Sequence, residues 1–552
     1  MSDHARKAIR NLRCGALPVR PAPVLALLLS AACGGDGGGG AAGAASDEAP
    51  GEPVTGGSVV ICAQGQPESL NPFLSPDQLS VDLAPLVFTP LVRIGPDWKL
   101  EGHLAMSWSW TEEGSRLELK LRSDLQWHDG APVSAEDVAW TIRTAADPAY
   151  GSWLAPDLET LESAEAIDPV TVEVRFREPF RPGLEPFAGI PVLPSHILAD
   201  LGPEAFQRAP FHREPVGNGP FRVVSRAGDG GILFERAPEY PAELGPVRLE
   251  RILFRSIPDE NTMGAELRSG GVDLCVTGSA TATVLEGVRG VSLEPLAPPS
   301  VFVVALNTSR APLDDVRVRR ALSAALIRAD VASVISPLAV PSVSPLTPGS
   351  PWMDPGAGQP DADPRLADSL LTAAGWTRDG GGPRTSGTGE QLRLAVFAPG
   401  AFETPLTAVQ ALWRQLGVEA DLRFMEWASY VRVLMDPDAR PDAMALSFVE
   451  DRVLRPDFSG TYASGSPRNI ASYRSADADR ILAALDAASA ESELDSLYRE
   501  LQFRLADDVP ILFVAYAPRV LAVGPRLEGV ETGPGAPFRS AASWWVPESR
   551  RR

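Results

Sequence analysis

The sequence predicts a mixed α/β protein built as two or more lobes, and three observations support this. The chain has 552 residues, 44% of them hydrophobic, so it can bury more than one large core. Strand-like and helix-like segments alternate along its body. Two apolar runs, SVFVVALN (300–307) and PILFVAYA (510–517), bracket one large block. If these runs pair side by side, the chain leaves a first lobe, builds a second and returns through the same crossing, which would form a hinge.

The N-terminus has the pattern of an export signal over residues 1–32. Basic residues come first, and the apolar run PAPVLALLLSAA that follows is too short to span a bilayer. The small residues directly before Cys33 resemble the lipobox of bacterial lipoproteins, in which the cysteine carries a diacylglycerol. We therefore expect lipidation at Cys33, with an ordinary cleaved signal as the alternative. Residues 33–57 are rich in Gly and Ala and are predicted to form a flexible tether.

The charge of the chain argues against nucleic acid as a partner. Its formal net charge is -21, with 71 acidic against 50 basic side chains, so phosphate backbones repel it. Anionic lipid headgroups repel it as well, so attachment to a membrane would come from acyl chains. Beyond the signal, no apolar run approaches the length of a transmembrane helix.

Periodicity predicts the elements of the body in order. The expected strands are SVVICA (58–63), RLELKLR (116–122) and TVEVRFR (171–177), followed by a strand, helix and parallel strand in LERILFRSI, ENTMGAELRSG and GVDLCV (249–276). The expected helices cover residues 316–327, 367–374 (closed by Gly375), the region around 413–416, and 476–507. The proline-rich stretch 337–364 is expected to be a loop.

Two cysteines remain once the signal and the lipid candidate are set aside. Cys62 and Cys275 both lie in apolar strand-like runs. An exported protein can keep a disulfide, whereas buried free thiols are equally natural in such runs. Both interpretations stay open from the sequence.

The stretch QWHDGAPVSAEDVAW (126–140) is interpreted as scaffold rather than as a catalytic or metal-binding cluster. Asp129 and Gly130 supply a turn, and Ser134 precedes a helix as its N-cap, with Asp137 three residues on. Acidic residues there favour the positive end of the helix dipole. His128 is assigned a structural role because the five histidines of the chain are scattered singly. No metal and no cofactor are expected.

Several motifs together resemble the family 5 extracellular solute-binding proteins, the peptide and nickel receptors of bacterial ABC importers. They are WHDGAPVSAEDVAW (127–140), SLNPF (69–73), LAMSWSW (104–110), PVGNGPF (215–221), LRSGGVDL (267–274), LNTSRAPLDDVRVRRALSAALIR (306–328), LLTAAGW (370–376) and ELDSLYRELQFRLADDVPILFV (493–514). They occur in the family's order and spacing and cover almost all of residues 58–516.

The resemblance implies a bilobal type II periplasmic-binding-protein fold with an extra subdomain in the first lobe. The expected boundaries are 58–98 with 215–302 and 514–547 for the core of lobe I, 99–214 for the inserted subdomain, and 303–513 for lobe II. The implied function is capture of a small solute or peptide between two closing lobes and its delivery to an ABC transporter permease, without catalysis. The protein is expected to be a monomer on the outer side of the cell membrane.

The candidate ligand site follows from the same resemblance. Peptide-binding relatives meet the ligand's α-ammonium with an acidic residue, and here Asp451, next to Glu450, stands in the corresponding stretch SFVEDRVLRPDFSG (447–460). The stretch lacks the tryptophan and the tyrosine–proline pair expected there, so it departs from the pattern of the peptide-binding relatives. The other candidate contacts are Gln66, Glu68, Phe448 and Trp427.

Alternatives remain open from the sequence. The glycine-rich PVGNGPF lacks the lysine of a phosphate-binding P-loop and precedes a predicted strand, so it is interpreted as a tight turn. A lipid-anchored hydrolase would need a nucleophile with its base, and no G-x-S-x-G motif is present. A sensor or surface interaction module on the same fold is the other alternative. Peptides, nickel chelates, sugars and other small solutes are all ligands of the family.

Overall fold

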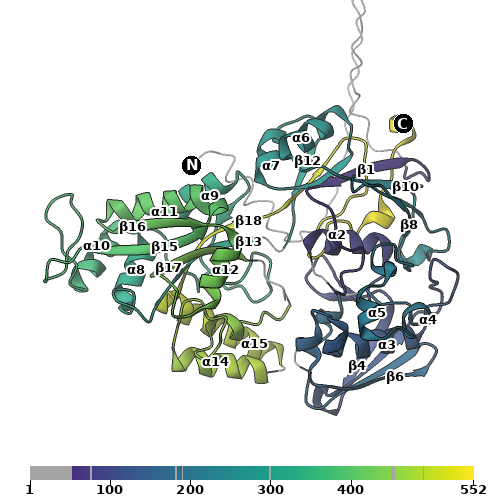
Figure 1. Cartoon of the computed structure of the whole chain (residues 1–552), viewed down its shortest axis with the longest axis horizontal. Helices are drawn as coiled ribbons and strands as arrows, with labels where there is room; N and C mark the ends of the chain where they lie inside the picture. The colour runs from purple at the N-terminus through teal and green to yellow at the C-terminus, as the bar shows by residue number, and fades with distance from the viewer. Residues whose placement is uncertain are drawn as a thin grey trace, which may run out of the picture. The chain divides into compact units, whose positions relative to one another are not determined.

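Two large β-sheets organise the chain in the computed structural model (Figure 1). The structure describes residues 52–74, 77–180, 183–188, 191–297, 300–448, 454–488 and 490–552, with the backbone alone at 279–280. All of them lie in one unit, Pro50–Arg552. The export signal, Cys33 and most of the predicted tether lie outside the described residues.

The first sheet has seven strands in the order β12-β19-β11-β1-β10-β9-β8. These are β12 (Ser292–Pro295), β19 (Val520–Val523), β11 (Leu274–Thr277), β1 (Ser58–Ala63), β10 (Arg251–Ser256), β9 (Ile232–Arg236) and β8 (Phe221–Arg226). The predicted strand–helix–strand unit is present as β10, α6 (Glu260–Ser269) and β11. The structure inserts β1 between its two strands, parallel to both. The local pattern could not show this, because β1 comes from a distant part of the chain.

The second sheet has six strands in the order β14-β18-β13-β17-β15-β16. These are β14 (Val340–Pro341), β18 (Ile511–Ala517), β13 (Ser300–Leu306), β17 (Ala443–Phe448), β15 (Arg393–Pro399) and β16 (Glu419–Met425). The two apolar runs singled out in the sequence pair as antiparallel neighbours, β13 and β18, with Val301 opposite Tyr516.

The two segments that connect the sheets run side by side. One leads from β12 to β13 and the other from β18 back to β19. β12 pairs with β19 in the first sheet, and β13 pairs with β18 in the second. Between these pairs, the backbone N–H of Leu296 donates to the carbonyl of Arg519 at 2.8 Å. The guanidinium of Arg519 in turn donates two hydrogen bonds to the buried carboxylate of Asp82.

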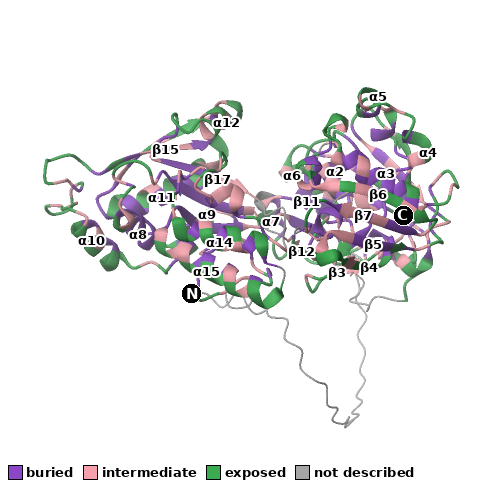
Figure 2. Ribbon diagram, turned by 90° about the horizontal axis from the view of Figure 1, so that it is seen from below, coloured by how far each residue is buried: buried purple, intermediate pink, exposed green. Residues whose placement is uncertain are grey.

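Helices cover both faces of the second sheet. Successive residues of β13 point to opposite faces and are apolar on both, so each face has to be covered. Phe302, Val304 and Leu306 share a core with the helices that run from α8 to α11, while Val301 and Val303 share one with α14 and α15. The helix bounds are α8 Val316–Ala324, α9 Arg328–Ile335, α10 Pro364–Ala373, α11 Glu403–Gln415, α14 Ala476–Ala487 and α15 Glu491–Asp508. The central strands are buried, and the outer helices carry the exposed residues (Figure 2).

Two expected helices differ from their predicted ranges. The helix predicted over 316–327 ends three residues early, at Ala324, and a separate helix, α9, begins at Arg328. Arg328 is buried at this break, where its guanidinium donates to the carbonyl of Phe513 at 2.7 Å and to the hydroxyl of Ser323 at 2.9 Å. The stretch predicted over 476–507 splits into α14 and α15. Apolar periodicity alone does not reveal where these helices end, because the apolar spacing continues past each end.

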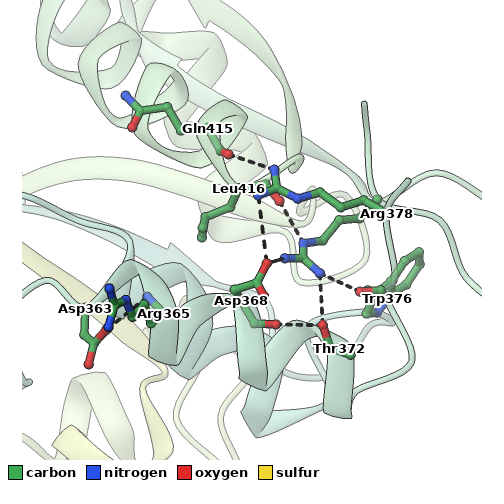
Figure 3. A network of polar contacts seen from close by, with 9 residues as sticks. Asp363, Arg365, Asp368, Thr372, Trp376, Arg378, Gln415 and Leu416 are labelled. Atoms are coloured by element: carbon green, nitrogen blue, oxygen red, sulfur yellow. Dashed lines mark hydrogen bonds and ion pairs between the residues drawn. The ribbon is translucent and has the colours of Figure 1, made fainter. Parts of the chain in front are cut away.

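A buried arginine connects the loop after α10 to the end of α11. The Arg384 side chain is 1% exposed and donates to the carbonyls of Leu416 (2.7 Å) and Trp376 (2.8 Å) and to the carboxylate of Asp368. Figure 3 shows Asp368, Trp376 and Leu416 converging on this network. A buried guanidinium keeps its charge and therefore needs hydrogen-bond acceptors around it. These acceptors hold Arg384, and with it the loop that leads into β15, in place. Gly375, with φ of +91°, closes α10 as predicted.

A smaller antiparallel sheet, β4-β5-β7-β6, lies between β3 and β8 in the chain. Its strands are β4 Ala105–Thr111, β5 Arg116–Leu121, β7 Thr171–Phe176 and β6 Leu161–Asp168, and α3 (Ala135–Ala146) packs on them; the two-stranded sheet β2 (Val92–Ile94) and β3 (Leu100–Gly102) precedes it. The inward residues of β5 and β7 share one continuous core with β1 and β10 of the first sheet.

The remaining helices are α2 Gln78–Val87, α4 Ser195–Leu198, α5 Pro203–Gln207, α7 Ser279–Leu285, α12 Trp427–Met435 and α13 Ser459–Tyr462. Within the described ranges, no helix combines the length and apolar character needed to cross a bilayer.

Candidate functional site

The carboxyl ends of the parallel strands in the first sheet meet at one edge. Ala63 at the end of β1 is in register with Ser256 at the end of β10, and β11 ends beside them at Thr277. In open α/β sheets, ligands bind in the crevice outside such ends, where the strand order reverses. The loops that leave this edge are therefore the first wall of the candidate site.

Gln66 and Glu68, two of the predicted ligand contacts, lie in the loop after β1. Both side chains are exposed. The Gln66 amide donates to the carbonyl of Asp229 in the β8–β9 turn at 3.2 Å. Gln64, which the sequence analysis did not select, donates to the carbonyl of Pro258 after β10 at 3.0 Å. The loop is therefore held to its neighbours by the amide side chains of Gln64 and Gln66.

Thr277 is a polar residue of this edge that the sequence analysis missed. Its hydroxyl is buried and has no hydrogen-bond partner within the described ranges. In the helix that follows, the N–H of Thr281 donates to the carboxylate of Glu260 at 3.1 Å. A threonine directly after the apolar run LCV at a strand end was the only signal in the sequence.

The second sheet also gathers carboxyl ends at one edge. β15 runs parallel to both β16 and β17, so the residues after Pro399, Met425 and Phe448 leave the sheet on the same side. Two predicted contacts, Trp427 and Phe448, lie here. Phe448 is the last residue of β17, is half-buried and packs against the core that includes α14 and α15.

Trp427 is held in an exposed position. It is 60% exposed at the first position of α12, immediately after β16. Its ring stacks on Tyr430 with centroids 6.0 Å apart, and the buried Tyr430 hydroxyl donates to the carbonyl of Ala445 on β17 at 2.9 Å. The Glu426 carboxylate caps the helix by accepting from the N–H groups of Ala428 and Ser429, which lowers its pKa. A large aromatic face presented in this way suits contact with an apolar ligand group.

The two acidic candidates cannot be placed. Glu450 and Asp451 lie outside the described residues, between Phe448 and Leu454. The structure therefore brings Gln66 and Glu68 to one sheet edge and Trp427 and Phe448 to the other, and leaves the acidic pair as a prediction.

The stretch around His128 and Asp137 is built as scaffold, as predicted. The Asp137 side chain is buried and accepts from the N–H of Ser134 at 2.9 Å, from the N–H of Ser195 at 2.8 Å and from the indole of Trp127 at 3.3 Å. The hydroxyls of Ser134 and Ser195 also donate to it, at 3.1 and 2.7 Å, so all of its acceptor capacity is used inside the protein. His128 accepts at Nδ1 from the N–H of Gly217 and donates from Nε2 to the carbonyl of Gly219 at 3.0 Å. Burial lowers its pKa and keeps the ring neutral.

The PVGNGPF turn packs directly against α2 and leads into β8. A Cβ atom on Gly217 would lie 2.0 Å from the carbonyl oxygen of Val87, and one on Gly219 would lie 2.5 Å from the carbonyl carbon of Val87. The glycines are therefore required by a close approach of two backbone segments. The N–H groups of Asn218 and Gly219 both donate to Val87 rather than facing a phosphate site.

Cys62 and Cys275 lie opposite each other on the parallel strands β1 and β11. The structure joins them in a disulfide, with Cα atoms 4.6 Å apart. Both residues are fully buried beneath α6 and α7. Within the described part of the chain, no group of three or more histidine, cysteine or acidic side chains is arranged to hold a metal ion.

A surface hollow of about 500 Å³ lies away from both edges, between α3 and β6. Its two arginines are already committed to the protein. Arg143 donates to the carbonyl of Ala164 at 2.5 Å, and Arg177 donates to the carbonyl of Leu161 at 3.3 Å. The carboxyl edges of the sheets remain the better candidate for a ligand.

Known proteins share sequence and fold with this chain. Residues 99–469 match the middle region of the bacterial extracellular solute-binding proteins, family 5. The oligopeptide-binding protein AppA of Bacillus subtilis is 23% identical over 95% of this chain and 97% of its own length. The nickel-binding periplasmic protein of Escherichia coli is 24% identical over 84% of this chain and 90% of its own. The crystal structure of the ABC transporter substrate-binding protein CtaP from Listeria monocytogenes superposes with a TM-score of 0.80 at 23% identity, covering 90% of this chain and 100% of that one. The fold is the expected type II periplasmic-binding-protein fold.

Proposed function

Because the chain belongs to family 5 of the bacterial extracellular solute-binding proteins, we propose that it captures a peptide outside the cytoplasm and delivers it to an ABC importer permease. The family consists of binding proteins, and this chain is one of them rather than an enzyme. Its relatives by name bind oligopeptides or nickel.

The observation that carries the proposal is the pairing of the two connections between the sheets. Two antiparallel crossings side by side, β12–β13 and β18–β19, form a joint about which two lobes can close. We assign residues 58–98, 215–302 and 514–547 to the core of lobe I, 99–214 to its inserted subdomain, and 303–513 to lobe II.

The ligand contacts follow from the carboxyl edges. Trp427 and Phe448 supply apolar surface from lobe II, and Gln66 and Glu68 supply polar groups from lobe I. Asp451, with Glu450 beside it, is assigned to the peptide's α-ammonium, because a closed cleft strips water from that cation and a fixed carboxylate must replace it.

Attachment to the membrane would run through the N-terminus. Lipid on Cys33 after removal of residues 1–32 would anchor the body, and residues 33–57 would serve as its tether. A single acyl chain binds a membrane only marginally, so a lipoprotein anchor with two or more chains fits stable attachment. Mass spectrometry of the membrane-extracted protein tests this, because a mature N-terminus at Cys33 carrying acyl mass is the expected result.

Identification of the ligand tests the main proposal. Native mass spectrometry of the purified protein should show a co-purified peptide, and calorimetry with that peptide should give saturable binding. Glutathione and the nickel–histidine complex serve as competing ligand classes. Exclusive binding of the nickel complex would contradict the peptide assignment, and turnover of an ester or peptide substrate would contradict the role of receptor.

The acidic contact has its own test. Asp451→Asn should weaken peptide binding by more than tenfold, since a hydrogen bond to a charged group contributes about 1.5–3 kcal/mol. The matched control is Asp438→Asn, an exposed aspartate on the same part of the chain. Equal affinity of both variants would remove Asp451 from the site.

A further inference from the structure

Glu185 is a buried carboxylate that no local sequence motif marks as functional. It begins the short helix Glu185–Ala188, between β7 and β8 in the chain, and is 7% exposed. Its Oε1 accepts from the backbone N–H of Leu454 at 2.8 Å and its Oε2 from that of Arg455 at 3.0 Å. These contacts join positions 269 and 270 residues apart in the sequence.

The segment 454–456 that Glu185 contacts is firmly held by the second sheet's helices. The Trp352 indole donates to the Leu454 carbonyl (2.6 Å), and the Tyr498 hydroxyl donates to the Pro456 carbonyl (2.8 Å). The Arg455 guanidinium donates to the carbonyls of Leu485 and Ala488 (2.8 Å each). The segment is therefore attached to α14 and α15. Glu185, in contrast, belongs to the inserted subdomain, which shares its core with the first sheet.

We propose that Glu185 is a positioning residue for ligand capture, which links the inserted subdomain to lobe II when the lobes close. This inference rests on the proposed function. An ionised carboxylate only accepts hydrogen bonds, and two adjacent backbone N–H groups match its two oxygens. Segment 454–456 lies within the stretch 447–460, which also contains the predicted acidic contacts Glu450 and Asp451.

The contact is suited to a reversible closure. When the lobes part, water can solvate both the carboxylate and the two N–H groups, so the net gain of the contact is far smaller than its gross strength. The contact shifts the equilibrium between open and closed lobes toward the closed state, and closure stays reversible. The apparent affinity of a ligand scales with the fraction of protein in the binding-competent state, so loss of the contact should weaken every ligand by the same factor.

The test compares Glu185→Ala and Glu185→Gln with Glu162→Gln, an exposed glutamate of the same subdomain. Small-angle X-ray scattering of the ligand-free proteins should show a larger radius of gyration for the Glu185 variants than for the wild type and Glu162→Gln, with the larger change in Glu185→Ala. Hydrogen exchange of the backbone amides of Leu454 and Arg455, which donate to Glu185, should accelerate about tenfold or more in both Glu185 variants. Glu185→Gln retains one acceptor and the side-chain volume, so it answers the question if Glu185→Ala does not fold.

Binding gives the second readout, with the tetrapeptide Ala-Ala-Ala-Ala as the probe. Glu185→Ala should bind about tenfold more weakly than the wild type, with Glu162→Gln unchanged. Unchanged scattering and exchange in the Glu185 variants would overturn the inference, even if their melting temperature fell, because that is the result of a purely structural contact. Failure of the wild-type protein to bind the peptide would count against the peptide proposal alone, since scattering and exchange are measured without ligand.

Discussion

The substitution Asp137→Asn tests whether the histidine- and acid-rich stretch is scaffold. One oxygen of Asp137 accepts from the N–H and hydroxyl of Ser195, and the other accepts from the N–H of Ser134 and the indole of Trp127. An asparagine has the same shape, but in either orientation its NH₂ group faces a backbone N–H that cannot turn away. An unpaired buried donor costs about 1–3 kcal/mol, and the remaining bonds lose their charge assistance. We expect a loss of about 2–4 kcal/mol in the free energy of unfolding.

Thermal and urea unfolding followed by tryptophan fluorescence would measure this loss. The matched control is Glu136→Gln, the neighbouring exposed carboxylate, which should change stability by less than about 0.5 kcal/mol. Ligand affinity of the folded Asp137→Asn protein should equal that of the wild type. Normal stability together with lost binding would refute the scaffold interpretation and would place Asp137 in a functional site.

Three further predictions follow from the structure. Gly217→Ala should fold poorly, seen as low soluble yield and an early melting transition, because its Cβ would lie 2.0 Å from the Val87 oxygen. Burial, with smaller contributions from nearby arginines, lowers the pKa of His103 to about 3 from 6.5. As the pH falls, the unfolded chain therefore takes up the proton before the folded one. The free energy of unfolding is highest above pH 6.5 and decreases toward pH 3 by at most about 1.4 kcal/mol per pH unit. Melting experiments between pH 4 and 7 should show this slope, and the His103→Gln variant should show a smaller one. Reduction of the Cys62–Cys275 bond, which closes a loop of 213 residues, should lower stability by about 2–5 kcal/mol in denaturant melts, and thiol titration of the unreduced mature body should find neither cysteine free.

The sequence by itself determined the elements that depend on local pattern. Alternation in RLELKLR predicted β5, the turn at Asp129–Gly130 and the cap at Ser134 predicted the start of α3, and the two apolar runs predicted paired crossing strands. These signals are local because side-chain periodicity, caps and positive-φ glycines are properties of a few neighbouring residues.

Only the tertiary structure decided which distant residues meet. It inserted β1 between β10 and β11, placed Cys62 opposite Cys275, and brought Glu185 to Leu454. It also ended the helix predicted over 316–327 at Ala324 and divided the one predicted over 476–507 after Ala487. Such contacts depend on strand order and on how buried polar groups find partners across the fold. No window of neighbouring residues contains that information, since the partners lie hundreds of residues apart in the chain.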